Sequence, residues 1–391
     1  TCQSATMVYN SFMADRKINL KNILSKKSLF LLGPRGTGKS FWIKKSLPNT
    51  LSFDLLNRDT FERFLKRPHQ LSEEIPSHVK EVVIDEIQKI PELLDEIHLL
   101  IETRGIRFLL TGSSPRKLKQ KGVNLLAGRA RDFRFFPLTL GEISKKLSDQ
   151  MMLKLINKGG VPSLFFSDEF DLDIRSYIQF YIMEEIKAEA IVRRVDNFAR
   201  FIDVLGLQNA KEMHFQNIAS DSGVPVRTVE NYLGVVEDTL LGFCLTPFER
   251  TKKRKAITRS KFYFFDLGVA RYLSRQGEIK MGSVIFGEYF EHFIILEIRA
   301  QFGLRGREAL LQYWRSKNGF EVDLILNNKI ALEFKATKSI DERHLKGLVA
   351  LREENLLEEY MVVSLDPIDR TINNIQVIHW RTFLQKILPS F

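Results

Sequence analysis

The stretch that decides the fold is Gly33-Pro34-Arg35-Gly36-Thr37-Gly38-Lys39-Ser40. It fits the pattern GxxxxGK(S/T), follows an apolar strand at Leu29–Leu32 and opens a helical stretch at Phe41–Ser46. Such glycines let the backbone fold closely around phosphate groups, with N–H groups and a helix N-terminus facing the anion. We expect all eight residues to line a nucleotide site, with Lys39 reaching the β- and γ-phosphates and Ser40 ligating Mg²⁺. The alternative is a Gly-rich turn that fits the pattern by chance.

A second apolar strand, Val82-Val83-Ile84, ends in the carboxylates Asp85 and Glu86. Ligands bind at the C-terminal ends of strands in parallel sheets, so these carboxylates are well placed to complete the site. We expect Asp85 to hold Mg²⁺ through water. Glu86 is expected to orient and deprotonate the attacking water.

Two further side chains are candidates for contacts to the γ-phosphate. The run Leu109–Ser114 ends the next strand, and we favour Ser113 over Thr111 as the hydroxyl that senses the phosphate. Arg129 follows Leu126-Ala127-Gly128 and is a candidate arginine finger that acts in a neighbouring subunit, with Arg131 as the second choice. The alternatives are an ordinary strand-end turn and surface arginines.

The chain alternates short apolar runs with helical stretches over residues 27–140, which predicts an α/β domain with a mostly parallel sheet. The predicted strands are Ser28–Gly33, Thr50–Leu55, Glu81–Asp85, Arg107–Thr111 and Phe133–Leu138. A chain of 391 residues is too long for one ordinary core, so two to three domains are expected.

The charge balance indicates a polyanionic partner. There are 59 Lys and Arg against 48 Asp and Glu, a net charge of +11, and the pI is near 9.4. DNA is the expected partner, and a dispersed basic surface is the alternative. Two cysteines in unrelated contexts argue against a zinc site and favour a reducing, cytoplasmic compartment. No apolar run approaches the ~18 residues that span a bilayer, so no membrane contact is expected.

Together these motifs resemble the AAA+ ATPases, and more narrowly a prokaryotic clade allied to the origin-recognition ATPases and the STAND-type switches. Gly159-Gly160-Val161-Pro162 adds to the resemblance, because that clade carries a GGxP turn in its helical lid. The resemblance implies ATP and Mg²⁺ as cofactors, a ring of subunits, expected to be a hexamer, and Pro162 packed on the adenine. An ordinary helix-capping turn is the alternative for Pro162. No lid arginine of the sensor 2 kind is evident.

A helix-turn-helix pattern follows the lid, with Phe215–Ser222, a Gly223-Val224-Pro225 turn and Val226–Leu240. Its small apolar core predicts a winged helix, with Arg227 exposed on the second helix. The basic residues that follow are predicted to form a flexible wing that contacts DNA phosphates. They are Lys252, Lys253, Arg254, Lys255, Arg259 and Lys261. A protein-contact module with a solvated basic run is the alternative.

The C-terminal third carries a second set of carboxylates. Phe320–Leu326 and Ile330–Lys335 read as two strands joined by a short loop, which places Asp323 opposite Glu333. Charged side chains in apolar strands need a partner, and a Mg²⁺ ion held by Asp323 and Glu333 would supply it. We expect Lys335 to steady the attacking water or the scissile phosphate.

This arrangement resembles the D…ExK pattern of PD-(D/E)XK nucleases, and Glu291 matches the helical Glu of that family. It closely resembles the nuclease-like domain often fused behind these AAA ATPases. The alternative is a nuclease fold kept only as a scaffold or DNA-binding surface. The predicted organisation is an extension (1–26), the AAA+ core (27–140), a helical lid (141–205), a winged helix (206–275) and a PD-(D/E)XK-like domain (276–391).

Three functions fit these motifs. The first is a DNA-dependent ATPase that remodels or translocates along DNA, with the nuclease-like domain gripping or cutting. The second is an ATP-licensed DNA nuclease. The third is a STAND-like switch in which the ATP state controls assembly with a protein partner.

Overall fold

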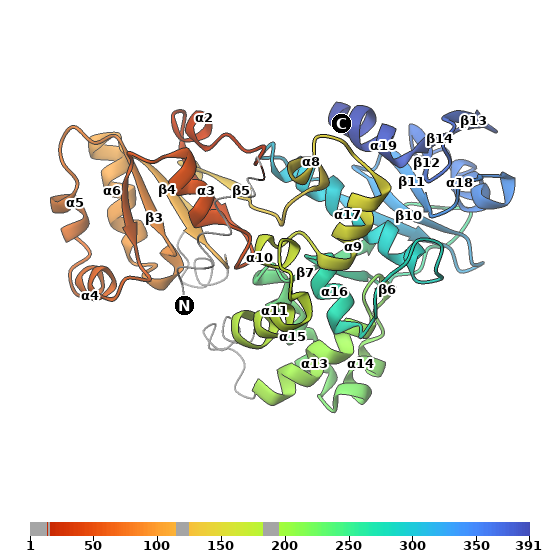
Figure 1. Ribbon diagram of the computed structural model, residues 1–391, viewed down its shortest axis with the longest axis horizontal. Coiled ribbons are helices and arrows are strands. Elements are labelled where there is room, and N and C mark those ends of the chain that lie inside the picture. The colour runs from red at the N-terminus through yellow and green to blue at the C-terminus, as the bar shows by residue number, and fades with distance from the viewer. Residues whose placement is uncertain (1–13, 15, 115–124, 183–194) are drawn as a thin grey trace.

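The computed structural model describes residue 14 and residues 16–114, 125–182 and 195–391. In Figure 1 a parallel sheet, coloured red to orange, lies at one end of the molecule, and a larger sheet that includes the blue strands lies at the other. Helices of the middle of the chain fill the space between them. Among the helices of the described ranges, none has the length and hydropathy needed to cross a bilayer.

The N-terminal sheet has five parallel strands in the order β2-β3-β4-β1-β5. They are β1 (Ser28–Leu32), β2 (Leu51–Asp54), β3 (Glu81–Asp85), β4 (Arg107–Gly112) and β5 (Ala130–Arg134). Helix α2 (Leu20–Leu24) precedes β1. The strands are connected by α3 (Lys39–Ser46), α4 (Arg58–Lys66), α5 (Gln70–Glu74), η1 (Ile87–Lys89), α6 (Leu93–Arg104) and η2 (Leu125–Gly128). The predicted α/β fold with a parallel sheet is confirmed.

Strand β1 lies inside this sheet, between β4 and β5, and its sequence is apolar from Leu29 to Leu32 because both of its faces are buried. Leu29 and Leu31 pack into the core on one face, whereas Phe30 and Leu32 pack into the core on the other. Both faces are covered, as expected for a parallel strand flanked by helices.

The fifth strand begins and ends earlier than predicted. It covers Ala130–Arg134, whereas the sequence analysis placed it at Phe133–Leu138. Phe135 N still donates to Leu32 O at 2.7 Å, but Pro137 has no N–H to donate. The N–H of Leu138 instead bonds the carbonyl of Gly160 at 2.7 Å. The chain therefore leaves the sheet after Phe135 and turns towards the helical segment.

The helical segment follows the sheet. It contains α8 (Leu140–Ile143), α9 (Asp149–Lys158), α10 (Pro162–Phe165), α11 (Phe170–Ser176), a π-helical turn η3 (Tyr177–Ile182) and α13 (Val195–Leu207). The next elements are β6 (Lys211–Glu212), α14 (Phe215–Ser222), α15 (Val226–Asp238), β7 (Gly242–Pro247), β8 (Lys261–Phe264) and α16 (Leu267–Leu273). Strand β8 pairs antiparallel with both β6 and β7.

The C-terminal third starts with the long helix α17 (Phe286–Gly303). It continues with β9 (Leu311–Arg315), β10 (Glu321–Leu326), β11 (Ile330–Lys335), η4 (Glu342–Leu345), α18 (Lys346–Arg352), β12 (Glu359–Ser364), β13 (Arg370–Ile372), β14 (Ile375–His379), α19 (Trp380–Thr382), η5 (Phe383–Ile387) and η6 (Leu388–Ser390). The pairs β9–β10 and β10–β11 are antiparallel, and β12 is parallel to β11.

Strands β7 and β9 join two parts of the chain into one sheet. They pair in parallel, with Thr246 opposite Gln312, so that β6, β7 and β8 extend the C-terminal strands into a nine-stranded sheet. One continuous apolar core runs from Leu140 to Leu388 through these elements. The helical segment and the C-terminal third are therefore packed together around shared side chains.

Candidate nucleotide site and C-terminal carboxylate cluster

The glycine-rich loop connects β1 to α3. Gly36 and Gly38 have φ values of 80° and 91°, in the left-handed region that favours glycine. Helix α3 then begins at Lys39, whose buried ammonium group donates to the carbonyls of Gly33 at 2.6 Å and Pro34 at 3.0 Å. The loop therefore holds a buried positive charge next to a helix N-terminus, an arrangement suited to phosphate.

Gly33 is required by a close approach of two backbone segments. A Cβ atom on it would lie 2.1 Å from the carbonyl oxygen of Phe135. Its N–H donates to Gly112 O at 3.2 Å, and Phe135 N donates to Leu32 O. The start of the loop is thus fastened between the ends of β4 and β5, which fixes where the loop begins.

Asp85 lies at the C-terminal end of β3 and joins the loop to the neighbouring strands. Ser40 Oγ donates to one carboxylate oxygen at 2.7 Å, and the hydroxyl of Thr111 donates to the other. Residues from α3, β3 and β4 therefore meet at a single carboxylate. Ser40 and Asp85 are the pair that the sequence analysis assigned to Mg²⁺.

Glu86 follows Asp85 in a left-handed conformation, with φ of 63°. Its N–H donates to the Thr111 hydroxyl at 3.1 Å, and its carboxylate accepts from the side-chain amide of Gln88. The same amide donates to Ser113 Oγ at 3.0 Å. Gln88 thus ties Glu86 to Ser113. The sequence analysis missed Gln88, whose only local signal is its place two residues after Glu86.

The helical segment reaches the glycine-rich loop at three points. The hydroxyl of Tyr177 donates to Arg35 O at 2.6 Å. A Cβ atom on Gly36 would lie 3.5 Å from Val161, and one on Gly38 would lie 3.8 Å from Pro162. The structure therefore brings Pro162 to the loop, where its predicted contact with adenine stays a prediction. Tyr177 was not singled out from the sequence.

Asp266 holds the turn that carries Val161 and Pro162. Its buried carboxylate accepts from the N–H groups of Gly160 at 2.6 Å and Val161 at 3.1 Å, and it caps α16 by accepting from Val269 N at 3.1 Å. Burial raises the pKa of Asp266 to about 6, although these N–H groups act in the opposite direction. This residue, 106 positions from Gly160, links α16 to the turn beside the loop.

Arg16 approaches the loop from the N-terminal side. Its guanidinium donates to the carbonyls of Thr37 and Phe136, and it forms an ion pair with Glu142 at 3.2 Å. Burial lowers the pKa of Arg16, and the Glu142 carboxylate opposes this shift. Arg16 therefore braces the loop against the start of the helical segment.

The candidate arginine finger is engaged within its own chain. Arg129 follows η2 and forms an ion pair with Glu102 of α6, and its side chain is 36% exposed. Arg131, the second candidate, is exposed on β5. Surface ion pairs of this kind contribute about 0–1 kcal/mol, so the contact would be readily exchanged for another acceptor. The role across a subunit interface stays a prediction.

The second candidate site lies where β10 and β11 run side by side. Leu324 pairs with Leu332, so Asp323 and Glu333 come next along the two strands. Asp323 accepts from Phe334 N at 2.8 Å, and one oxygen of Glu333 accepts from Lys335. The other oxygen, Oε2, is buried with no hydrogen-bond partner in the described structure.

Burial and mutual repulsion dominate the electrostatics of these carboxylates. Burial, reinforced by the nearby Asp323 charge, raises the pKa of Glu333 well above its usual range. Burial also raises the pKa of Glu291 on α17 to about 7. Burial lowers the pKa of Lys335, but the carboxylates of Asp323 and Glu333 outweigh this effect and raise it. The carboxylates of Glu291, Asp323 and Glu333 therefore outnumber the single ammonium group of Lys335 beside them.

Lys261 does not belong to the exposed basic run in which the sequence analysis placed it. It begins β8, is 5% exposed, and pairs with Glu321 at 2.6 Å and Glu291 at 3.4 Å. The hydroxyl of Tyr263 donates to the same Glu291 oxygen. Strand pairing turns Lys261 inward, so its ammonium group neutralises carboxylates and is not available to a DNA phosphate.

The remaining basic run is the connection between β7 and β8, and it is fastened to α18. The carboxylate of Glu354 accepts from the N–H groups of Lys252, Lys253 and Arg254 at 2.8–3.0 Å. The guanidinium of Arg254 pairs with Glu353 at 2.6 Å. The predicted flexible wing is therefore anchored by backbone hydrogen bonds.

Of the residues assigned to DNA, several remain on the surface. Lys252, Lys253 and Lys255 are exposed, and Arg227 is exposed on the first turn of α15. Arg259 is also exposed and lies 3.9 Å from Glu212. Within the described ranges, no group of three or more His, Cys, Asp or Glu side chains is arranged to hold a metal ion.

Three family models match consecutive parts of the chain. Residues 25–144 match an AAA domain. Residues 150–280 and 286–383 match two domains of unknown function, DUF8612 and DUF4143. An uncharacterized protein of Haemophilus influenzae is 22% identical over 222 residues, which covers 52% of this chain and 55% of that relative. The chain therefore spans little more than half of the length of this relative.

Two solved structures align with the chain at low similarity. One is the Aeropyrum pernix ORC1 protein in complex with DNA, with 13% identity over 66% of this chain and 90% of that chain. The other is a STAND protein with a tetratricopeptide repeat sensor from Pyrococcus horikoshii, with 12% identity over 78% of this chain and 47% of that chain. Both TM-scores are 0.25, too low to support an argument.

The assignment therefore rests on the family match together with the geometry of the loop. The matched segment contains the parallel sheet, the glycine-rich loop and the Ser40–Asp85 contact. Residues 25–144 of this chain match an AAA domain and carry a glycine-rich loop of the phosphate-binding pattern on a parallel α/β sheet.

Proposed function

We propose that this chain binds and hydrolyses Mg·ATP at the glycine-rich loop and couples hydrolysis to work on DNA. The observation that carries the proposal is the meeting of Lys39, Ser40 and Asp85 at the C-terminal ends of parallel strands. Ligands of open α/β sheets bind at this edge. The AAA domain match supports ATP as the nucleotide.

The residues present fit both nucleotide and metal. Gly36 and Gly38 are left-handed and carry no Cβ atom, so phosphate can approach the backbone at these two positions, and the Lys39 ammonium is buried within the loop. Lys39 would bind the β- and γ-phosphates, while Ser40 and Asp85 would hold Mg²⁺. When bound, the ion supplies charge neutralisation at the phosphate oxygens.

Glu86 is the residue best placed to act on the attacking water. The Thr111 hydroxyl and the Gln88 amide fix its backbone and carboxylate, respectively. A carboxylate held in this way can accept a proton from water as a general base. Ser113, which shares Gln88, would sense the γ-phosphate through the same amide.

A ring of subunits would complete the site. Arg129 is partly exposed and pairs with the surface acid Glu102, and an arginine in this place would supply positive charge to the site of a neighbouring copy. Mixing Arg129→Ala subunits with Lys39→Ala subunits should restore part of the ATP hydrolysis if Arg129 acts across an interface. A protein that is monomeric at full activity would contradict the ring.

The elements α13, α14 and α15 followed by the antiparallel strands β7 and β8 support a winged helix. Arg227 on α15 and the exposed lysines between β7 and β8 offer positive charge for DNA phosphates. The net charge of +11 supports the same partner.

The C-terminal third supports a nuclease-like domain that grips or cleaves DNA. The order α17-β9-β10-β11-α18-β12, with Asp323 and Glu333 on neighbouring strands, supports the resemblance to PD-(D/E)XK nucleases. The partnerless Oε2 of Glu333 is the observation that favours a bound cation, because a buried carboxylate oxygen without a donor is costly. Mg²⁺ needs only one or two carboxylates and completes its shell with water and phosphate. Asp323 and Glu333 would hold it, and Lys335 would orient the phosphate.

The test is ATP hydrolysis by the full chain with and without duplex DNA, together with Glu86→Gln and the exposed-surface control Glu73→Gln. We expect Glu86→Gln to retain ATP binding and lose hydrolysis, whereas Glu73→Gln behaves as wild type. A wild type that hydrolyses no ATP under either condition contradicts the proposal. ATP hydrolysis unaffected by DNA, with no DNA bound at moderate salt, would favour the STAND-like switch. DNA cleavage that needs bound ATP would favour the ATP-licensed nuclease.

A further inference from the structure

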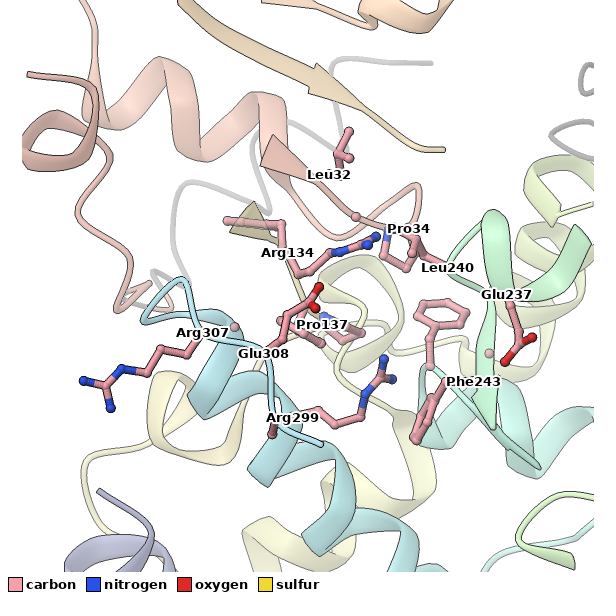
Figure 2. A pocket seen from close by; sticks show the side chains of 17 residues that line it. Leu32, Pro34, Arg134, Pro137, Glu237, Leu240, Phe243, Arg299, Arg307 and Glu308 are labelled. Atoms are coloured by element: carbon pink, nitrogen blue, oxygen red, sulfur yellow. The ribbon is translucent and has the colours of Figure 1, made fainter. Parts of the chain in front are cut away.

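A pocket of about 280 Å³ lies at the junction of the AAA domain with the rest of the chain (Figure 2). The start of the glycine-rich loop and the end of β5 form one wall. The end of α15, the start of β7 and the last turns of α17 form the others. Most lining side chains are apolar, including Pro34, Pro137, Leu240 and Phe243. The composition is that of a small-ligand pocket, with an apolar lining and a few polar groups.

Arg299 of α17 is the first of these polar groups. Its guanidinium lies 3.5 Å from the ring centre of Phe243 and 5.9 Å from that of Phe136. Figure 2 shows the Arg299 side chain directed towards Phe243. It forms no hydrogen bond or ion pair with any residue in the described part of the chain. Burial, reinforced by the like charge of Arg134, lowers the pKa of Arg299 to about 9, whereas the carboxylates of Glu237 and Glu308 act in the opposite direction.

Arg134, the last residue of β5, is the second polar group that lines the pocket. Its Nη1 atom is buried and has no hydrogen-bond partner among the described residues. The nearest acid is Asp132, whose carboxylate lies 3.9 Å from the other terminal nitrogen. In Figure 2 its side chain reaches across the pocket towards Pro34. Two guanidinium groups from different parts of the chain therefore keep hydrogen-bond donors without acceptors.

The acids of the lining form no hydrogen bond or ion pair with Arg299 within the described residues, although Glu237 and Glu308 lie near enough to favour its charge. Glu237 accepts a hydrogen bond from Cys244 N at 3.1 Å. Glu308 and Arg307 are exposed to solvent, and Arg307 points away from Arg134 and Arg299 in Figure 2. Guanidinium donors that water cannot reach are unfavourable without an acceptor, and an anion placed between the two guanidinium groups would accept hydrogen bonds from them.

We propose that this pocket binds a small aromatic phosphate monoester. Its phosphate would accept hydrogen bonds from Arg134 and Arg299, because guanidinium groups match phosphate oxygens well. Its ring would pack against the apolar wall of Pro34 and Leu240. Such a ligand would bridge β5 of the AAA domain to α17 beside the start of the nucleotide loop. This site is separate from the ATP-binding role of Lys39 and does not depend on it.

The experiment is calorimetric titration of the full chain with phenyl phosphate and with adenosine monophosphate. Inorganic phosphate and benzyl alcohol serve as probes that lack the ring or the charge. The variants are Arg299→Gln and Arg134→Gln, with Arg58→Gln as the exposed control on α4. We expect saturable binding of at least one aromatic phosphate, weakened about tenfold or more by each pocket variant and unchanged in Arg58→Gln. Should Arg299→Gln not fold, Arg134→Gln carries the test.

The same titration in Lys39→Ala separates the pocket from the nucleotide loop. Binding that persists there and is lost in Arg134→Gln supports the pocket. A preference for adenosine monophosphate over phenyl phosphate would identify the ligand of the pocket as a nucleotide. Equal affinity for the two would show that the pocket recognises only an aromatic ring and a phosphate. The proposal would be overturned if no probe bound saturably at about 10 mM, a concentration above the ~1 mM Kd of a weak ligand. Binding that is lost only in Lys39→Ala would overturn it as well.

Discussion

Ser40 and Asp85, which are 45 residues apart in the chain, share a hydrogen bond of 2.7 Å from the serine hydroxyl to the carboxylate. This contact brings the first residues of α3 to the end of β3. It is the pairing that a phosphate-binding loop needs in order to hold a divalent ion beside the phosphates.

Asp266 is predicted to position the turn beside the nucleotide. Asp266→Asn replaces one of the two accepting carboxylate oxygens with an NH₂ group. The NH₂ group cannot accept hydrogen bonds from the N–H groups that Gly160 and Val161 present. We expect the KM for ATP to rise about tenfold, corresponding to the ~1–2 kcal/mol of a lost buried hydrogen bond, with a smaller change in kcat. Steady-state kinetics measure it, with the exposed Asp168→Asn as control. Identical KM values in both variants would remove this role.

The exposed lysines between β7 and β8 are predicted to contact DNA phosphates. Replacing Lys252, Lys253 and Lys255 by alanine spares Arg254, which packs against Phe320 and Glu353. Each lost phosphate contact lowers the slope of log affinity against log salt by roughly 0.9, so the slope should flatten by about 2–3. The control replaces the exposed lysines Lys21, Lys26 and Lys66. If both triple variants give the wild-type slope, DNA binds elsewhere.

The C-terminal carboxylates are predicted to bind a divalent ion. In the absence of ATP, calorimetry with Mn²⁺ should show a site in wild type that Asp323→Asn abolishes and Glu358→Gln, a surface control, retains. Any nicking of plasmid DNA should be lost with the site and on addition of EDTA, whereas ATP hydrolysis continues. Mn²⁺ uptake that is equal in wild type and Asp323→Asn would contradict the metal assignment.

His292 is predicted to make the fold sensitive to acid. It is fully buried on α17, where its ring nitrogens contact Phe264 O at 2.8 Å and Asn209 Nδ2 at 3.3 Å. Burial lowers the pKa of His292 to about 4, so the unfolded chain takes up a proton near pH 6.5 before the folded chain does. The stabilisation present above pH 6.5 is therefore lost as the pH falls towards 4.

Between pH 7 and pH 5 this loss is about 2 kcal/mol for His292 alone. Urea unfolding of wild type and His292→Gln at both pH values measures it, since the variant lacks the titrating ring. We expect the change in unfolding free energy from pH 7 to pH 5 to be less favourable for wild type than for the variant, because the buried carboxyls Asp266 and Glu291, whose raised pKa values act in the opposite direction, are present in both. Equal losses would mean that other groups set the acid sensitivity.

Local patterns in the sequence were enough to predict the AAA core and the facing carboxylates. The strand before Gly33 and the strand ending at Asp85 are apolar because both faces of the sheet are covered. The short loop between β10 and β11 leaves one register in which Asp323 and Glu333 come together. In these cases neighbouring residues decide the structure.

Contacts between segments far apart in the chain could not be predicted from local sequence patterns. Lys261 lies in a basic run, but pairing of β8 with β6 and β7 turns it towards Glu291 and Glu321. Asp266 and Arg299 have ordinary local sequences, and their importance comes from elements packed against them from elsewhere in the chain. The fifth strand was predicted too late in the sequence because Leu138 N donates a hydrogen bond to Gly160 O and not to the sheet. The local sequence pattern does not predict this tertiary contact.

The central claim, that the glycine-rich loop binds Mg·ATP, is tested most directly by equilibrium binding of ATP to wild type, Lys39→Ala and Lys44→Ala. Lys39 is buried in the loop, whereas Lys44 is exposed on the same helix, so the two variants remove the same charge from different places. We predict that wild type and Lys44→Ala bind Mg·ATP equally and that Lys39→Ala binds at least a hundredfold more weakly, the ~3 kcal/mol of a charged hydrogen bond to phosphate. Equal affinity in all three proteins would contradict the account.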